Sequence, residues 1–147
     1  MKNDSALFYT CSLIEYIGRR QKQRRSAVAE YLGRDVIKRI YNYADVFHCE
    51  PIEKTADDFI HKTGVPMGDF DNVEKCRYEV PDCWTIGEVY ERLIEDMADS
   101  SEKNIIDLTM EIYLSWIDGA ISNYNTDFYY QSREYICECY KEGKICA

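Results

Sequence analysis

The sequence predicts an all-α fold: a compact bundle of six or seven helices in a single domain that spans residues 1–147. Three observations support this prediction. Apolar residues recur every three or four positions through most of the chain, which is the spacing of one helix face. Only seven glycines and three prolines interrupt this pattern. The chain is 46% hydrophobic, so it has enough apolar side chains to fill one core.

Helix-start and helix-stop residues divide the N-terminal half of the chain. Asp4 or Ser5 can cap the first helix, and Gly18 is a natural end for it. The basic stretch RRQKQRR (residues 19–25) either extends this helix or forms a loop. Four helices are expected in this half, and they span residues 5–18, 26–33, 35–47 and 51–64.

The pattern changes after residue 64. Residues 64–72 contain two Gly, one Pro and three Asp or Asn, which are turn-forming residues. Residues 73–84 are the one region where a short extended segment is credible, because Pro81 prevents a long helix there. Thr85 and Glu88 have the spacing of a capping box. Three further helices are expected, spanning residues 85–97, 101 or 104 to 121, and 132–142.

Composition narrows the class of protein. No apolar run approaches the roughly 20 residues needed to cross a bilayer, and the N-terminus lacks the features of a signal peptide. We therefore expect a soluble cytoplasmic protein. Its seven cysteines are expected to be free thiols, several of them buried as small apolar side chains.

The charge is unevenly distributed. The net charge is −9, yet residues 19–39 carry a local charge of +6, which leaves −15 on the rest of the chain. The basic segment consists of Arg19, Arg20, Lys22, Arg24, Arg25, Arg34, Lys38 and Arg39. Such asymmetry concerns partners and self-association rather than fold. The segment either contacts nucleic acid or docks against the acidic part of a second copy, and a homodimer is the outcome we favour.

Residues 26–43 have the outline of a helix-turn-helix, with Gly33 at the turn and Arg34, Lys38 and Arg39 on the second helix. Phosphate contacts dominate nucleic-acid affinity, so the local positive charge supports this interpretation. The acidic remainder of the chain opposes it, and so does a second helix with little base-reading chemistry. A glycine corner between two helices is also common in ordinary α bundles.

Candidates for catalysis or metal binding are weak. His48, Cys49 and Glu50 are adjacent at a helix end, where consecutive side chains point in different directions. The spacings of Cys76 with Cys83 and of Cys137 with Cys139 and Cys146 do not match the short gaps of structural zinc sites. Phosphate-binding loops and common hydrolase motifs are absent from the sequence. We expect no enzyme activity, no cofactor and no metal.

Acidic and aromatic residues suggest an interaction surface instead. The stretch NYNTDFYYQSREY (residues 123–135) is rich in tyrosine, which suits wet interfaces because it combines an apolar ring with a polar tip. The alternative is an aromatic minicore that closes a helix corner. The candidate partner-binding residues are Glu91, Glu95, Asp99, Tyr124, Tyr129 and Tyr130.

The stretch IYNYADVFHCEPIEKTADDFI (residues 40–60), with SAVAEYLG upstream, resembles small helical bacterial proteins of unknown function. Some of these are encoded beside genes for ADP-ribosyltransferase-like or other toxins. The shared pattern comprises Tyr41, Asp45, Val46 and His48 with altered spacing, followed by an acidic helix. The resemblance implies a cytoplasmic bacterial antitoxin or accessory inhibitor, and it assigns no catalytic residue.

The leading hypothesis is a non-enzymatic acidic module that masks a basic partner protein. Its carboxylates would steer the encounter, and its tyrosines would provide buried contact area. The alternative is a helix-turn-helix regulator that binds nucleic acid through residues 26–43.

Overall fold

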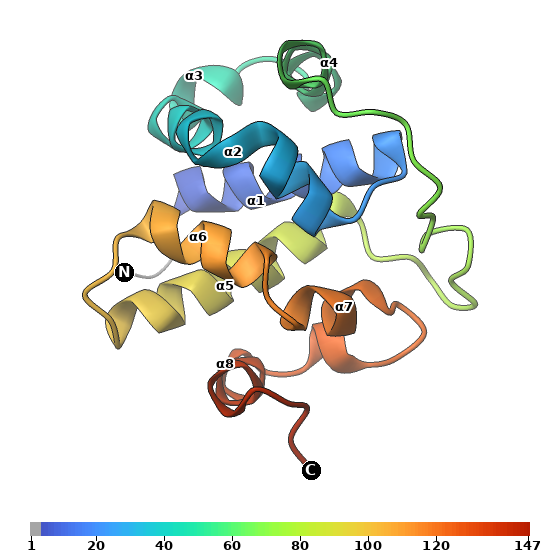
Figure 1. Ribbon diagram of the computed structural model, residues 1–147. Helices are drawn as coiled ribbons and strands as arrows, with labels where there is room; N and C mark the ends of the chain where they lie inside the picture. The colour runs from blue at the N-terminus through green and yellow to red at the C-terminus, as the bar shows by residue number, and fades with distance from the viewer. Residues whose placement is uncertain (1–3) are drawn as a thin grey trace.

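The computed structural model describes residues 4–147 and confirms the predicted all-α class (Figure 1). Within these residues the chain forms eight α-helices, one 3-10 helix and no strand. The helices are α1 (Ser5–Gln21), α2 (Arg25–Asn42), α3 (Ala44–Phe47), α4 (Ile52–Thr63), α5 (Cys83–Asp99), α6 (Ile105–Tyr113), α7 (Ile117–Ser122), η1 (Phe128–Tyr130) and α8 (Arg133–Glu142).

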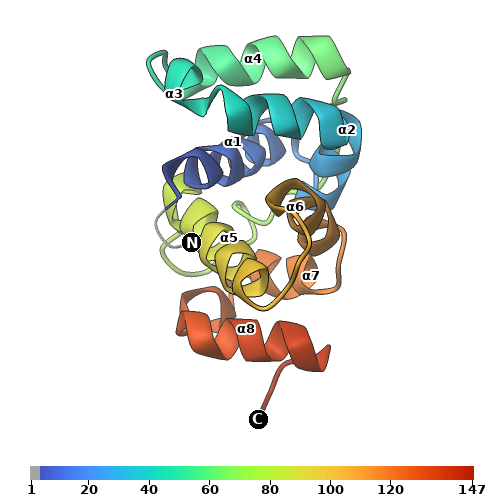
Figure 2. The same cartoon turned by 90° about the vertical axis from the view of Figure 1, so that its left-hand side faces the viewer.

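The helices stack in layers. Helices α1 and α5 lie at the centre and make the most extensive helix–helix contact of the bundle. Helix α4 covers one end of the stack and α8 covers the other, and the C-terminus lies beyond α8 (Figure 2). One continuous cluster of buried apolar side chains joins all the layers. No helix among residues 4–147 is both long enough and apolar enough to span a membrane.

Polar side chains fix where the helices begin. Each of these side chains accepts a hydrogen bond from a backbone N–H in the first helical turn, which otherwise has no partner. The four capping residues, which begin α1, α5, α6 and α8, are Asp4, Asp82, Asn104 and Ser132. Of the alternatives that the sequence offers, Asp4 rather than Ser5 caps α1, and Asn104 rather than Ser101 caps α6; Ser132 caps α8. Helix α5 is capped by Asp82 rather than by the proposed capping box of Thr85 and Glu88.

Helix α1 continues past Gly18, where the sequence predicts its end, and stops at Gln21. Its last turn closes on Lys22, which takes up the left-handed conformation (φ 52°). Gly18 is buried where the chain folds back, and a Cβ on it would lie 3.0 Å from the Gln23 carbonyl oxygen. This glycine therefore permits close approach of the backbone and does not end the helix.

The sequence predicts that one helix ends at Gly33 and another begins after it, but the structure has a kink within a single element at this position. Residues 25–42 form one element, α2, in which Gly33 alone departs from helical geometry, with φ 78° and ψ 165°. A left-handed φ of this kind is accessible to glycine at little cost. The second half of α2 ends at Asn42, and α3 follows as a separate single turn rather than as its continuation.

The helix predicted to reach residue 121 is broken in two. Helix α6 ends at Tyr113, and α7 starts at Ile117. Between them the Ser115 hydroxyl donates a hydrogen bond to the Ile112 carbonyl oxygen at 2.7 Å. Serine side chains compete in this way with the backbone for hydrogen bonds, which weakens helices. The break turns α7 toward the N-terminal end of α2.

The long connection between α4 and α5, residues 64–82, packs along the bundle without forming a strand, so the extended segment considered for residues 73–84 has no ladder partner. Its backbone follows the end of α1: Gly68 N–H donates to Gln21 O at 2.7 Å, and Phe70 N–H donates to Lys22 O at 3.0 Å. The Asn72 side chain donates to Ser122 O at 2.8 Å. The bond from Asn72 brings the connection to the C-terminal end of α7.

Candidate functional site

Most residues of the basic segment are paired with acidic residues of the same chain. Five of its eight residues form ion pairs with carboxylates of the same chain. The pairs are Arg19 with Glu15, Arg20 with Asp57, Lys22 with Asp71, Arg25 with Glu15 and Asp118, and Arg34 with Asp107. The local charge of +6 is therefore not a basic patch that faces solvent as one surface.

Three basic residues remain exposed without a carboxylate partner among residues 4–147. The guanidinium of Arg24 lies 4.3 Å from the centroid of the Phe70 ring, and that of Arg39 lies 5.7 Å from the centroid of the Tyr43 ring. Lys38 is exposed on the same helix as Arg39. The second half of α2 also buries Ile37 and Ile40 in the core. Only its outer edge is open to a ligand.

Arg25 is the clearest correction to the exposed basic patch, because it is 3% exposed. Its Nε donates to Asp118 Oδ1 at 2.7 Å, and its two terminal nitrogens donate to Glu15 Oε1 at 2.5 Å and to Ser122 Oγ at 2.6 Å. The Tyr124 hydroxyl lies 3.0 Å from the same guanidinium. The side chain therefore links α2 to α1 and α7.

The charges around Arg25 balance. Glu15 also accepts from Arg19 Nε at 2.5 Å and from the Tyr124 hydroxyl at 2.8 Å, and Asp118 accepts from the Tyr90 hydroxyl. Burial acts to raise the pKa of Glu15, but the positive charges of Arg25 and Arg19 outweigh it and lower that pKa below its usual value. Two cations thus face two anions, so this cluster is a structural link.

A signal for this burial exists in the sequence. Arg25 shares one helical face with Val28, Ala29 and Leu32, all of which are buried. A charged residue on an apolar face indicates a buried ion pair when carboxylates are available elsewhere in the chain. The local density of positive charge obscures that periodicity.

Three of the six candidate partner-binding residues are also buried. Glu91, Glu95 and Tyr124 are 6%, 1% and 3% exposed, so they cannot contact a partner in this structure. Helical periodicity explains the two glutamates, because they lie on the apolar face of α5 with Leu93 and Ile94. Asp99, Tyr129 and Tyr130 keep solvent access, and Tyr130 is 67% exposed.

The two buried glutamates form a second polar cluster. Glu95 accepts from the backbone N–H of Asp4 at 2.8 Å and from the guanidinium of Arg133 at 3.2 Å. Burial, the hydrogen bond to Glu95 and the negative charge of Glu95 together raise the pKa of Glu91 to about 8. The protonated form of Glu91 is therefore favoured at neutral pH, and its carboxyl group can donate the hydrogen bond to Glu95. This cluster holds α8 and the N-terminus of α1 against α5.

Two exposed aromatic side chains, Tyr78 and Tyr130, and the half-buried Tyr129 lie together around η1. Tyr129 and Tyr130 are consecutive in η1, and their ring centroids lie 5.0 Å apart with the ring planes at 81°. Tyr78, which is 66% exposed, lies on the α4–α5 connection and lines a groove together with these two residues. We call Tyr78, Tyr129 and Tyr130 the tyrosine surface.

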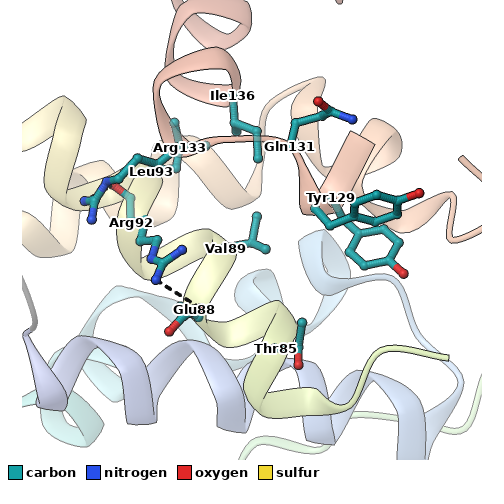
Figure 3. Close-up of a pocket in the computed structure, with 10 residues that line it drawn as sticks. Thr85, Glu88, Val89, Arg92, Leu93, Tyr129, Gln131, Arg133 and Ile136 are labelled. Atoms are coloured by element: carbon teal, nitrogen blue, oxygen red, sulfur yellow. Dashed lines mark hydrogen bonds and ion pairs between the residues drawn. The ribbon is translucent and has the colours of Figure 1, made fainter. Parts of the chain in front are cut away.

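The first groove beside the tyrosine surface runs between α5 and the start of α8 (Figure 3). Val89 points into it from α5, Gln131 and Ile136 bound it on the opposite side, and Tyr129 lies at one end. At the other end Arg92 forms an ion pair with Glu88 at 3.3 Å. This groove is apolar at its centre, and the charges along it already have partners.

A second groove lies on the other side of η1. It is lined by the three tyrosines of the tyrosine surface together with Glu79, Tyr124, Asn125, Thr126 and Asp127. Glu79 and Asp127 are exposed and form no ion pair with another residue among 4–147. Its charged lining is thus purely acidic. We call it the acidic tyrosine groove.

Asn125 holds the two walls of the acidic tyrosine groove together. Its Oδ1 accepts from the backbone N–H of Arg77 at 2.7 Å, and its Nδ2 donates to the Lys75 carbonyl oxygen at 3.1 Å. Both bonds cross from the η1 segment to the α4–α5 connection. The groove is therefore formed by two segments that are far apart in the sequence, which the pattern of residues 123–135 does not reveal.

The other candidate chemistry is not assembled. His48, Cys49 and Glu50 are exposed beyond the end of α3. All seven cysteines are free thiols, and Cys11, Cys137 and Cys139 are buried, as the sequence predicts. No group of three or more His, Cys, Asp or Glu side chains in the described part of the chain is arranged to hold a metal ion.

Comparisons with known proteins leave the tyrosine surface and its two grooves as the basis for a functional assignment. No protein-family model, curated protein or solved structure matches this chain.

Proposed function

We propose that the protein is a non-enzymatic binding module that masks a basic partner protein, in the manner of an antitoxin or inhibitor, and that the tyrosine surface is its contact site. The observation that supports this proposal is the meeting of two grooves at exposed tyrosines. Both grooves are lined by Tyr129 and Tyr130, which project from a short, well-anchored segment.

Tyrosine favours this role for a physical reason. Its ring provides a large contact area with few rotatable bonds, and its hydroxyl forms hydrogen bonds at a wet interface. Binding energy at interfaces is concentrated in a few such aromatic anchors that fill pockets on the partner or seat beside its side chains. Tyr78 and Tyr130 are the two most exposed aromatic side chains in the described part of the chain, and both line the acidic tyrosine groove.

The charge distribution supports a basic partner. The net charge of −9 attracts cationic proteins at long range. Near the tyrosine surface, Glu79 and Asp127 are exposed, and Glu134 and Glu138 are exposed on the adjoining helix α8. These four carboxylates, together with Asp99, take the steering role that the sequence alone assigns in part to the buried Glu91 and Glu95.

Site-specific photo-crosslinking tests the proposal. A benzophenone amino acid is placed at position 130 in one variant and at position 31 in a matched control. Tyr31 is an exposed aromatic residue of α2, outside both grooves. The proteins are irradiated in cells of the source organism, and the adducts are identified by mass spectrometry. We expect a reproducible adduct with one basic protein at position 130 and not at position 31.

The absence of a specific adduct at position 130, or the same adduct from position 31, contradicts the tyrosine surface as the contact site. Adducts with nucleic acid from α2 favour the helix-turn-helix alternative instead. The ion pairs of Arg19, Arg20, Lys22, Arg25 and Arg34 weaken that alternative, because guanidinium and ammonium groups already bound to carboxylates contribute less to phosphate binding.

A further inference from the structure

We propose that the acidic tyrosine groove binds the guanidinium of an arginine side chain presented by the basic partner. This inference rests on the proposed function and makes it specific. It names the chemical group that the protein recognises and the residues that recognise it.

The ring geometry suits a cation. Tyr129 and Tyr130 stand at 81° to each other with centroids 5.0 Å apart, so they form two adjacent walls of a corner. Tyr78 lines the groove from the α4–α5 connection as a third aromatic element. Aromatic faces attract cations through the ring quadrupole, and several rings around one space are the usual way in which proteins hold a cationic group.

The charged lining of the groove also lacks a counter-charge. Glu79 and Asp127 are the charged residues that line it, and neither forms an ion pair with another residue among 4–147. Arg77 is near in sequence, but it does not line the groove. The negative charge of Glu79 reaches the rings as well, because it contributes, after burial, Cys76 and Tyr130, to raising the pKa of Tyr129.

Most other polar groups in the groove are already engaged. The Asn125 side chain bonds to the backbone on both sides, the Thr126 hydroxyl donates to Asn123 O at 2.9 Å, and the Tyr124 hydroxyl donates to Glu15. Among the lining side chains, the acceptors that can still receive a donor from a ligand are therefore the two carboxylates and the hydroxyls of Tyr78, Tyr129 and Tyr130. The groove is prepared for a donor-rich cation rather than for an anion.

Guanidinium fits this arrangement better than ammonium. It is planar and weakly hydrated, it stacks on aromatic faces, and its five N–H donors point in several directions within one plane. A guanidinium seated against the tyrosine corner can therefore donate to carboxylates on different sides. The groove of Figure 3 lacks this capacity because its lining already contains two guanidinium groups. Its carboxylate, Glu88, is paired with Arg92, and Arg133 is paired with Glu95 and Asp96.

The test uses calorimetric titration of the full-length protein with three blocked peptides of alternating glycine and one other residue: arginine, lysine or the uncharged citrulline. The test variant is Glu79→Gln/Asp127→Asn. Its matched control is Glu134→Gln/Glu138→Gln, which removes the same number of exposed charges from α8. All four side chains are exposed, so both variants are expected to fold.

We expect the arginine peptide to bind more tightly than the lysine peptide, and the citrulline peptide to bind without measurable affinity. Charge-assisted hydrogen bonds to two carboxylates predict a loss of about tenfold or more in the test variant. The control should lose no more than about threefold, because it changes only the long-range field. A second pair of variants compares Tyr130→Ala with Tyr31→Ala. We expect Tyr130→Ala to weaken binding of the arginine peptide more than Tyr31→Ala does, because only Tyr130→Ala removes the cation–π contact.

Several results overturn the inference. Equal losses in the test and control variants show that the peptide senses net charge alone. Equal affinity for the arginine and lysine peptides contradicts the selectivity for guanidinium. Binding of the citrulline peptide shows that a positive charge is not required. No binding of any peptide also overturns it. The photo-crosslinking result is independent of the peptide titrations. A specific adduct at position 130 without selective binding of the arginine peptide shows that the partner is recognised, but not through arginine.

Discussion

At the scale of single residues, Arg25 is a buried charge that links three helices. Its guanidinium is buried and surrounded by two carboxylates, two hydroxyl groups and a backbone carbonyl. A buried ion pair repays the cost of desolvation only when its remaining donors and acceptors are satisfied, as they are here. Removal of one partner leaves the others charged and unsolvated. The cluster is therefore stable as a whole and sensitive to each of its parts.

Replacement Arg25→Met should lower the free energy of unfolding by about 3–5 kcal/mol, because Glu15 and Asp118 lose their shared counter-ion. Arg24→Met is the matched control on the neighbouring exposed residue and should cost ~0–1 kcal/mol. Urea unfolding followed by circular dichroism measures both values. A similar, small loss in the two variants contradicts the buried network.

Glu91 makes stability depend on pH. Its pKa is about 8 in the folded protein, against an ordinary value of 4.5. Between these values the folded state binds more protons than the unfolded state, so the free energy of unfolding falls as pH rises from about 4.5 to about 8. The stability contributed by protonated Glu91 is fully present below the unfolded pKa and is lost as pH passes through the folded pKa.

The variant Glu91→Gln mimics the protonated side chain and should remove this decline. We expect little change in the free energy of unfolding near pH 5 and a gain on the order of 3 kcal/mol near pH 8.5. Glu102→Gln, on an exposed loop residue, is the control and should change neither value by more than about 0.5 kcal/mol. A pH profile that is identical for wild type and Glu91→Gln argues against a shared proton between Glu91 and Glu95.

At the scale of elements, the contact of α1 with α5 is the most extensive helix–helix contact and forms the centre of the bundle. The two helices approach each other closely at Gly87 of α5, where a Cβ would lie 2.9 Å from Ser12 Cα and 2.8 Å from Ser12 N. These atoms belong to the backbone and cannot rotate away. Gly87 is therefore required for packing, although nothing in its local sequence distinguishes it from a glycine that merely weakens a helix.

Substitution Gly87→Ala should push the two helices apart and lower the free energy of unfolding by about 1–3 kcal/mol. Gly119→Ala is a matched control in α7, where an added Cβ has no neighbour within 4 Å. It should be neutral or stabilise the protein by up to about 1 kcal/mol, because alanine favours helix. Thermal and urea unfolding measure the pair. If both substitutions stabilise, the close approach of α1 and α5 is not rigid.

At the scale of the whole molecule, the intramolecular ion pairs change what the uneven charge implies. The sequence alone suggests that the basic segment docks against the acidic remainder of a second copy. Because five of its eight residues are paired with carboxylates of the same chain, that complementarity is satisfied within each molecule. We therefore expect a monomer of net charge −9 instead of the homodimer favoured from the sequence alone.

A triple variant, Arg24→Gln/Lys38→Gln/Arg39→Gln, removes the three basic residues of the segment that lack carboxylate partners. We expect wild type and variant to sediment alike as monomers. Neither should bind duplex DNA more tightly than the roughly 10⁻⁴–10⁻⁶ M of non-specific association. Sedimentation velocity and fluorescence anisotropy at several salt concentrations measure both properties. Tight, salt-sensitive binding that disappears in the variant supports the helix-turn-helix alternative, and a wild-type dimer that dissociates in the variant supports self-docking.

The sequence by itself determined the features that depend on neighbours along the chain. Helical periodicity is local, so it predicted the all-α class. Capping is local as well, so the sequence limited the start of α1 to Asp4 or Ser5 and the start of α6 to Ser101 or Asn104. The grouping of Tyr129 and Tyr130 follows from their adjacency.

Only the tertiary structure decided which charges are buried and which residues share a groove. The energy of a charged side chain depends on what surrounds it in space, so Arg25 looks like part of a basic surface until α1 and α7 supply Glu15 and Asp118. The acidic tyrosine groove likewise needs Asn125 to bind a segment some 50 positions away in the chain. Such contacts leave no periodic trace in the sequence, because they join elements whose relative placement is fixed by the packing of the whole bundle.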